Sequence, residues 1–142
     1  MEPDIERPAL GIRQPWAELI LRGIKTIEVR SSHTKQRGTI YVYASKKVAN
    51  TSAAKLAADE HEIDLDALPR GVIVGTVQIA GSKATTPEDE KQSCLPPSLL
   101  EGKFGWHLED ARRLDEPLTP RFLPYGVWFY PFRRKSTAVN GE

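Results

Sequence analysis

Three ionisable side chains fall within six positions of the stretch GIKTIEVRSS, residues 23–32. These are Lys25, Glu28 and Arg30, and the residues between them are mostly apolar. A glutamate beside two cations can orient either one, and a lysine that is partly desolvated next to another cation has a lowered pKa. Such a lysine can act as a general base or activate a nucleophile. The alternative is a charged strand face that is simply solvated.

Two chemistries fit these residue types. Cleavage of a phosphodiester without a metal needs a base for the 2′-hydroxyl and cations for the charge that develops on phosphorus, and Lys25, Arg30 and Lys46 are of the right types. Hydrolysis of an amide needs a water held by a pair such as Lys25 and Glu28. The sequence leaves both open.

The neighbouring elements would position this cluster. The segment PWAELILRG predicts a helix, since Trp16, Leu19 and Ile20 recur at helical spacing and Gly23 suits a left-handed end. TIEVR then alternates as a strand, which places Glu28 and Arg30 on one face roughly 6.5 Å apart. A second strand, GTIYVYAS, follows a polar connection. Its alternation places Ile40, Val42 and Ala44 on one face and Tyr41, Tyr43 and Ser45 on the other.

The rest of the chain predicts more strands with one further helix. Residues 51–61 favour a helix with Thr51 or Ser52 as its N-cap, and GVIVGTVQIAG is a strand in which Gly75 marks a bulge or bend. Residues 82–102 predict a long surface loop with short helical pieces. FGWHLEDARRL and GVWFYPF supply the last strands. The pattern indicates an α+β domain around a curved or closed sheet.

Charge is unevenly distributed along the chain, although the net charge is only +1. Residues 10–47 carry eight basic and two acidic side chains, and residues 55–116 carry seven basic and thirteen acidic ones. A basic surface of the first kind attracts phosphate groups. The two halves could instead neutralise each other in the fold.

Several classes of protein are disfavoured. With Cys94 as the only cysteine there is no internal disulfide, and the polar N-terminus is no signal peptide. No apolar run has the roughly 18 residues of a membrane span. The histidines are scattered and the phosphate-loop and dinucleotide spacings are missing, so we expect no metal and no cofactor. These features predict a soluble cytoplasmic protein.

The segment LGIRQPWAELILRGIKTIEVRSSHTKQRGTIYVYASKK resembles the start of an ASCH domain, a member of the PUA-like β-barrel superfamily. The matching features are QPWA, the spacing G-x-K-x-x-E-x-R from Gly23 to Arg30, and the strand that ends at Ser45. FGWHLEDARRLDEPL and GVWFY resemble later strands of the family, so the likeness covers most of residues 8–130.

The resemblance implies a small mixed or antiparallel β-barrel of five to six strands with two or three flanking helices. We expect a flexible leader over residues 1–6, a single domain over residues 7–132 and a disordered tail over residues 133–142. The resemblance also implies association with RNA and, for some bacterial members, ribonuclease activity or amide hydrolysis on an acylated pyrimidine nucleoside.

The leading hypothesis is therefore binding of RNA or a nucleotide-like ligand in a cleft around the cluster. The first alternative is a hydrolase there, either a metal-independent ribonuclease or an amidohydrolase on N4-acetylcytidine-like nucleosides, with Lys25, Glu28 and Arg30 as catalytic residues. The second is a protein-interaction module that uses the acidic half. The expected ligand-binding residues combine basic groups for phosphates with aromatic rings for bases: Arg13, Gln14, Trp16, Lys25, Arg30, Ser31, Arg37, Tyr43, Ser45, Lys46, Lys47 and Trp106.

Overall fold

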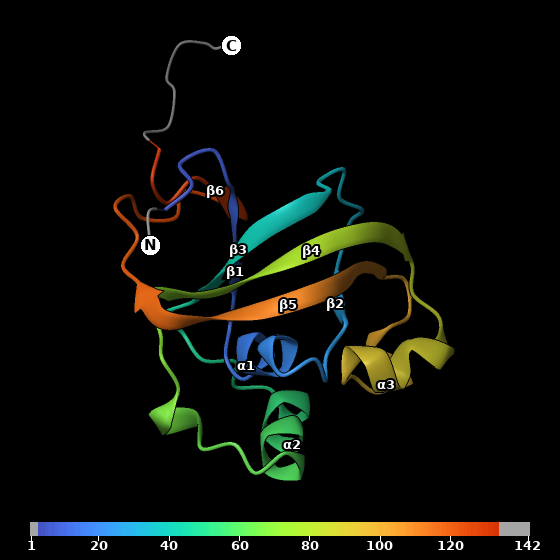
Figure 1. The fold of residues 1–142 in the computed structure, drawn as a ribbon. Coiled ribbons are helices and arrows are strands. Elements are labelled where there is room, and N and C mark those ends of the chain that lie inside the picture. The colour runs from blue at the N-terminus through green and yellow to red at the C-terminus, as the bar shows by residue number, and fades with distance from the viewer. Residues whose placement is uncertain (1–2, 134–142) are drawn as a thin grey trace.

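A curled six-stranded sheet forms the body of the protein in the computed structural model, which describes residues 3–133 (Figure 1). The strand order is β2-β5-β4-β3-β1-β6, with β1 parallel to β3 and every other pair antiparallel. This confirms the predicted α+β class, and the curled mixed sheet agrees with the predicted small mixed or antiparallel barrel of five to six strands. The strands are β1 (Ala9–Ile12), β2 (Ile27–Arg30), β3 (Gly38–Ala44), β4 (Val72–Ala84), β5 (Phe104–Leu118) and β6 (Trp128–Phe129).

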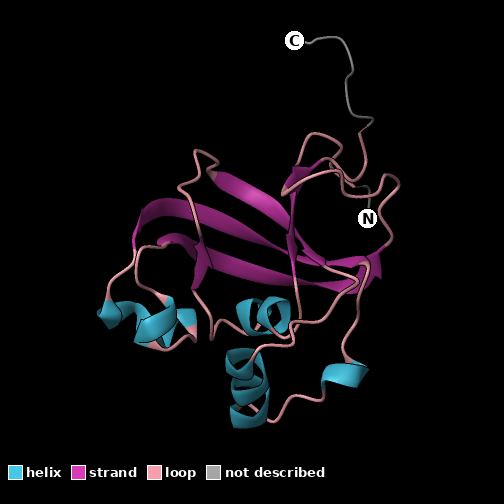
Figure 2. Cartoon of the chain, turned by 180° about the vertical axis from the view of Figure 1, so that it is seen from behind, coloured by secondary structure: helices cyan, strands magenta, loops and turns pink. Residues whose placement is uncertain are grey.

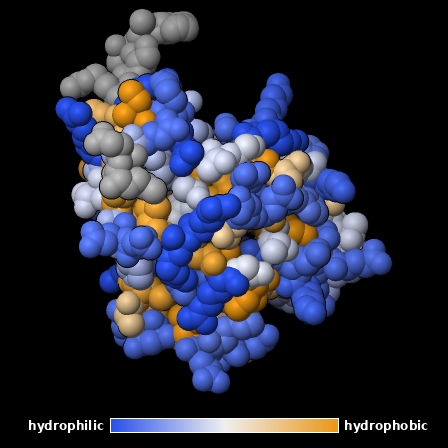
Figure 3. All heavy atoms as spheres, viewed as in Figure 1, coloured by the Kyte–Doolittle hydropathy of each residue, from blue (hydrophilic) through white to orange (hydrophobic). Residues whose placement is uncertain are grey.

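Three short helices lie together on one side of the sheet, as the views in Figures 1 and 2 both show. They are α1 (Trp16–Leu21), α2 (Ser52–Glu60) and α3 (Glu90–Ser93), with 3-10 turns at η1 (Leu65–Ala67), η2 (Pro87–Asp89) and η3 (Pro97–Leu99). Hydrophobic atoms are exposed on this side of the molecule, among hydrophilic ones (Figure 3). No helix within residues 3–133 has the length and apolarity that crossing a membrane requires.

Local signals in the sequence explain where the helices begin and end. The hydroxyl of Thr51 accepts a hydrogen bond from the backbone N–H of Ala54 at 3.2 Å, which confirms the predicted N-cap of α2. Gly23 has φ +76° just after α1, as its left-handed role requires. Pro15 is the N-cap of α1 and not its first residue, a difference of one position.

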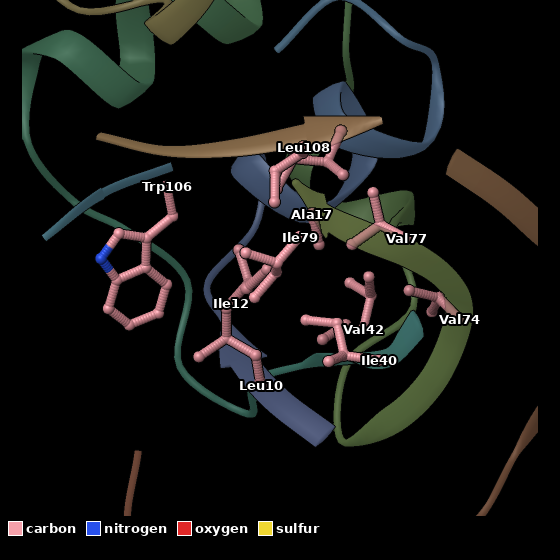
Figure 4. Close-up of a cluster of buried hydrophobic side chains, with 12 residues drawn as sticks. Leu10, Ile12, Ala17, Ile40, Val42, Val74, Val77, Ile79, Trp106 and Leu108 are labelled. Carbon is pink, nitrogen blue, oxygen red and sulfur yellow. The ribbon is translucent and has the colours of Figure 1, made fainter. Parts of the chain in front are cut away.

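Alternation along β3 divides its side chains between two apolar clusters. Ile40 and Val42 face the inside of the curled sheet, where Figure 4 shows them in one cluster with Leu10 and Ile12 of β1 and with residues of β4 and β5. Tyr41 and Tyr43 alternate with these residues and pack in a second cluster with Phe129, on the opposite face of the strand. The predicted separation of these two faces is therefore confirmed.

Gly75 lies at an irregularity in β4, as predicted. The register shifts between Ile73 and Gly75 against β5, and between Val42 and Tyr43 of β3 on the other side. A Cβ atom at this position would overlap the carbonyl oxygen of Arg112 and a methyl group of Leu21. Only glycine lets the bent strand and α1 approach this closely.

Three predicted boundaries were wrong. β4 continues into the expected surface loop as far as Ala84, because it pairs with Phe104 at the start of β5. β5 runs on to Leu118 through Pro117, which is tolerated because β2 pairs only with the first residues of β5 and leaves the rest as an edge. The closing strand β6 has two residues, since it pairs only with Ala9 and Leu10.

The terminal regions contact each other where they are described. The backbone N–H of Asp4 donates to the Tyr41 hydroxyl at 2.7 Å, and Arg133 pairs with Glu6 at 2.7 Å. Residues 1–2 of the predicted leader and residues 134–142 of the predicted tail lie outside the described residues. The domain boundaries stay a prediction.

Candidate ligand-binding site at the open side of the barrel

Lys25 is buried, with 2% of its surface exposed, between the end of α1 and the start of β2. Its Nζ donates a hydrogen bond to the backbone carbonyl of Ser93 at 2.6 Å and lies 4.9 Å from the ring centre of Trp16. The next residue, Thr26, is also bound to this segment, through its N–H and the carbonyl of Gln92 at 2.8 Å. A cleft was expected around the cluster, but Lys25 does not face an open cleft, because α3 covers it.

Glu28 lies between the two cations, and its contact with Arg30 agrees with the predicted alternation of β2. Its Oε2 accepts a hydrogen bond from Arg30 Nε at 2.8 Å, and its Oε1 lies 3.9 Å from Lys25 Nζ. The Glu28 side chain is 9% exposed and that of Arg30 is 24% exposed. Arg30 is thus the member of the cluster that reaches solvent.

Arg30 also spans the open side of the curled sheet. Its Nη2 donates to the carbonyl of Gly11 at 3.0 Å, which joins β2, at one edge of the sheet, to β1 near the other edge. Its guanidinium lies 5.4 Å from the ring centre of Trp106. A planar cation held over an aromatic ring is a common arrangement in nucleotide recognition.

Trp106 closes the same side of the barrel from β5. Its ring is 3% exposed and stacks on Trp128 of β6, with centroids 5.8 Å apart and planes within 8°. Its Nε1 donates to the carbonyl of Ser32 at 2.9 Å. Trp106 is thus almost fully covered, whereas Trp128 and Trp16 are half-buried.

Burial changes the ionisation of two neighbouring groups. Desolvation lowers the pKa of Lys25, and Arg30 lowers it further, against the opposing effects of Glu28 and Cys94. Desolvation likewise raises the pKa of the Cys94 thiol, although Lys25 opposes that shift. The lysine at the centre of the cluster is therefore easier to deprotonate than a lysine in water.

A second group of cations lies at the ends of β1 and β3, and β1 ends at Ile12, one residue after the Gly11 that Arg30 contacts. Hydrogen bonds from Ser45 N–H to Ile12 carbonyl (3.0 Å) and from Gly71 N–H to Ala44 carbonyl (2.6 Å) bring three chain segments together there. The basic side chains that these segments carry are all exposed, and no acidic group within residues 3–133 forms an ion pair with them. We call them the basic edge: Arg13, Lys46, Lys47 and Arg70.

Other residues that were predicted to bind the ligand either lie elsewhere in the fold or already form hydrogen bonds within the protein. Tyr43 is 3% exposed, packs on Phe129 at the outer face of the sheet and has its pKa raised by burial. Arg37 precedes β3, at the opposite end from Ser45, and donates to the carbonyls of residues 34 and 36. The buried amide of Gln14 accepts from Glu18 N–H at 2.9 Å and donates to the Pro69 carbonyl at 3.1 Å.

The ASCH domain family model matches residues 10–118, which is most of the chain. This protein belongs to the ASCH domain family. The match includes α1, the Lys25–Glu28–Arg30 cluster and strands β1 to β5. It ends before β6, so Trp128 lies outside the matched residues.

A short segment of the chain is also similar to two curated proteins. Over 38 residues the chain is 47% identical to activating signal cointegrator 1 from human and from mouse. That alignment covers 27% of this chain and 6% of those proteins, so the ASCH chain matches only a small part of their length.

Crystal structures of an ASCH protein from Zymomonas mobilis share the fold. One superposes with a TM-score of 0.60 at 14% sequence identity, covering 89% of this chain and 88% of that one. A mutant form of the same protein gives a TM-score of 0.59 at 14% identity, covering 91% and 90%. At this identity the likeness concerns the fold alone.

Sequence reasoning missed a second buried charge in this ASCH domain. Glu18 is 6% exposed, accepts hydrogen bonds from both Arg113 terminal nitrogens at 2.9 Å, and pairs with Arg22 at 2.7 Å. Burial raises the pKa of Glu18, but hydrogen bonds and charge from Arg113 and Arg22 outweigh it, so the pKa is lowered. Arg22 lies one helical turn after Glu18, at i,i+4, whereas nothing local in the sequence points to Arg113.

Ser31 lies exposed after β2. Within residues 3–133 there is no group of three histidine, cysteine, aspartate or glutamate side chains placed to hold a metal. What the site does contain is one solvent-reaching guanidinium, aromatic rings beside it and the adjoining basic edge. This arrangement can hold an anionic group next to a planar one.

Proposed function

We propose that this ASCH domain binds RNA or a nucleotide-like ligand at Arg30 and the adjoining basic edge. The observation that carries the proposal is the position of Arg30, which stacks near Trp106 while its guanidinium is still partly exposed. An aromatic and guanidinium surface suits a base, and neighbouring unpaired cations suit the phosphates that follow it. The family resemblance supports the same ligand class.

The basic edge supports a ligand longer than one nucleotide. Most other arginines of residues 3–133 have acidic partners, for example Arg112 with Asp110 at 3.1 Å and Arg113 with Glu18. Arg13 and Arg70 have none, and two lysines lie between them along the edge. Cations without partners attract phosphate groups without first breaking an ion pair.

Under this proposal Lys25 is a buried residue that holds other residues of the site in position. Its amine fixes Ser93 and faces the carboxylate that orients Arg30, so replacing it with alanine loosens both interactions. We therefore expect weaker binding in Lys25→Ala as well as in Arg30→Ala.

The test is fluorescence anisotropy with a labelled single-stranded RNA at low salt. Arg30→Ala should weaken binding by about tenfold, the typical effect of losing a charged hydrogen-bonding group. Arg112→Ala is the matched control, because this arginine is 73% exposed and lies outside the site. Unchanged affinity in both Arg30→Ala and Lys25→Ala, with circular dichroism showing intact folds, would contradict the proposal.

A hydrolase is the second candidate, and the lowered pKa of Lys25 favours it. Loss of the Lys25 proton, which the lowered pKa makes easier, leaves an amine beside Glu28 that can take a proton from a 2′-hydroxyl or from a water, while Arg30 stabilises the developing negative charge. Because Lys25 is 2% exposed, this reaction requires α3 to move away from it.

Two substrates separate the hydrolase alternatives. Labelled RNA, with and without a chelator, tests for ribonuclease activity, and N4-acetylcytidine tests for amide hydrolysis. Turnover should fall to background in Glu28→Ala. If the unmodified protein releases no more product than Glu28→Ala on either substrate, the hydrolase candidate is eliminated.

A further inference from the structure

A groove of about 850 Å³ separates α2 from the segment that contains α3 and η3. It lies on the helical side of the molecule, and Figure 1 shows the two helices that border it. Its lining comes from the turn after α1, from one face of α2 and from the α3–η3 segment. The residues that the argument uses are Ile24, Leu56, Ala57, Glu60, Glu90 and Leu99.

The groove exposes apolar side chains above an apolar floor. Leu56 is 68% exposed and Leu99 is 45% exposed, one on each wall. The floor includes Ala57, Ile24 and Cys94, which belong to or pack against a buried cluster centred on Leu19. In the lower part of the view in Figure 3, where Figure 1 shows the helices, hydrophobic atoms are exposed among hydrophilic ones. Apolar surface that is exposed and rimmed by polar groups is typical of an interaction site.

The walls of the groove are acidic. Residues 51–66, which contain α2, carry one basic and five acidic side chains, and residues 86–101, which contain α3 and η3, carry one basic and four acidic ones. Glu60 and Glu90 are themselves lining residues, one from each wall, and Lys91 is the one lysine beside them. This charge repels nucleic acid and attracts a cationic partner.

The shape of the groove favours a helical partner. All of its lining residues belong to helices and the turns between them, so no strand edge is available for an added strand. A helix that lies between two helices presents apolar residues at i, i+3, i+4 and i+7 to such a groove. Its remaining faces then meet the acidic walls.

We propose that this groove binds a basic amphipathic helix from a partner protein, with leucine-like residues on Leu56 and Leu99 and lysine or arginine opposite Glu60 and Glu90. The site is independent of the RNA-binding proposal, because it uses different residues and the opposite sign of charge. Either proposal can fail while the other stands.

The probe is a fluorescein-labelled peptide of about 14 residues, roughly 21 Å long as a helix, with leucines at helical spacing and lysines elsewhere. A scrambled peptide of the same composition, without the apolar stripe, is the first control. We expect the intact protein to bind the probe at least about tenfold more tightly than the scrambled peptide, measured by anisotropy.

Variants locate the binding. Leu56→Asp should weaken binding about tenfold or more, and Glu60→Lys should weaken it and reduce its dependence on salt. Leu123→Asp is the matched control, since Leu123 is 63% exposed and lies outside the groove. Both leucines are exposed, so neither substitution disturbs the core.

Three results would overturn the proposal. One is equal affinity for the two peptides, or equal losses in Leu56→Asp and Leu123→Asp. Another is a dimer, detected by light scattering, that Leu56→Asp dissolves, because the occupant is then a second copy of this chain. The third is a small apolar dye that binds in a Leu56-dependent way while the peptide does not bind.

Discussion

The indole rings of Trp106 and Trp128 stack 5.8 Å apart although their strands, β5 and β6, are second and last in the order of the sheet. No ladder of backbone hydrogen bonds joins the two edges within residues 3–133. Side chains close the barrel instead, with the bond from Arg30 to the Gly11 carbonyl as the second link. The candidate ligand site lies at this closure.

Removing the Trp128 ring should therefore destabilise the fold. Trp128→Ala should lower the free energy of unfolding by about 2–4 kcal/mol, because the variant lacks both the half-buried aromatic surface and the stacking partner of Trp106. Urea unfolding followed by circular dichroism measures this. The adjacent, 56% exposed Val127 is the control, and Val127→Ala should change stability by less than about 0.5 kcal/mol. Similar losses in both variants would argue against closure by the indoles.

The close approach at Gly75 predicts a severe effect of one added methyl group. Gly75→Ala should cost about 2–4 kcal/mol, since its Cβ meets the Arg112 backbone, which cannot move without disturbing β5. At Gly81, in the same strand, an added Cβ meets nothing within 4 Å. Thermal unfolding of Gly75→Ala and Gly81→Ala should therefore differ, and equal melting temperatures would contradict the packing described.

Glu18 predicts a pH dependence of stability. Its pKa is lower in the folded protein than in the unfolded chain, so it stabilises the fold above its ordinary pKa of 4.5, and this contribution is lost as the pH falls through the lowered value. At pH 7, Glu18→Gln should be about 1–3 kcal/mol less stable than the parent protein. That difference should shrink in acid, as urea titrations at several pH values would show.

Glu109→Gln, at an exposed position, is the control for this titration and should show no such trend. A difference between Glu18→Gln and the parent protein that stays constant with pH would mean that the Arg113 and Arg22 pairs do not set the ionisation of Glu18.

RNA binding at the basic edge predicts a specific salt dependence. Replacing Arg13, Lys46 or Lys47 with alanine should reduce the slope of log affinity against log salt by about 0.7 for each phosphate that the variant no longer neutralises. Lys55→Ala removes the same charge from an exposed position on α2 and should leave the slope unchanged. Equal slopes for all four variants would mean that the basic edge is not part of the RNA-binding surface.

Elements whose determinants are local were predictable from the sequence. Alternation divided the side chains of β3 correctly, Gly23 and Thr51 marked helix ends, and Gly75 marked an irregularity. In each case the physical cause lies within a few residues of its effect, so the pattern contains it.

The site itself depended on interactions that no local pattern encodes. Lys25 is buried by Ser93, 68 positions away, and Glu18 is held by Arg113, 95 positions away. Spacing placed Glu28 beside Arg30 but gave no information about which cation faces solvent. Tyr43 was expected at the ligand and packs on the outer face, because alternation separates faces without stating which one borders the site.

The short helix α3 contributes both to the surroundings of Lys25 and to the groove beside α2. On one side the carbonyl of Ser93 holds the Lys25 amine, and on the other Glu90 and Lys91 line the acidic groove. A helix seated in the groove would therefore also hold α3 closed over the lysine, while a substrate of the hydrolase candidate, which requires α3 to move away from Lys25, would displace a wall of the groove. Thermodynamic linkage makes such antagonism reciprocal, so each ligand would weaken the other by the same factor.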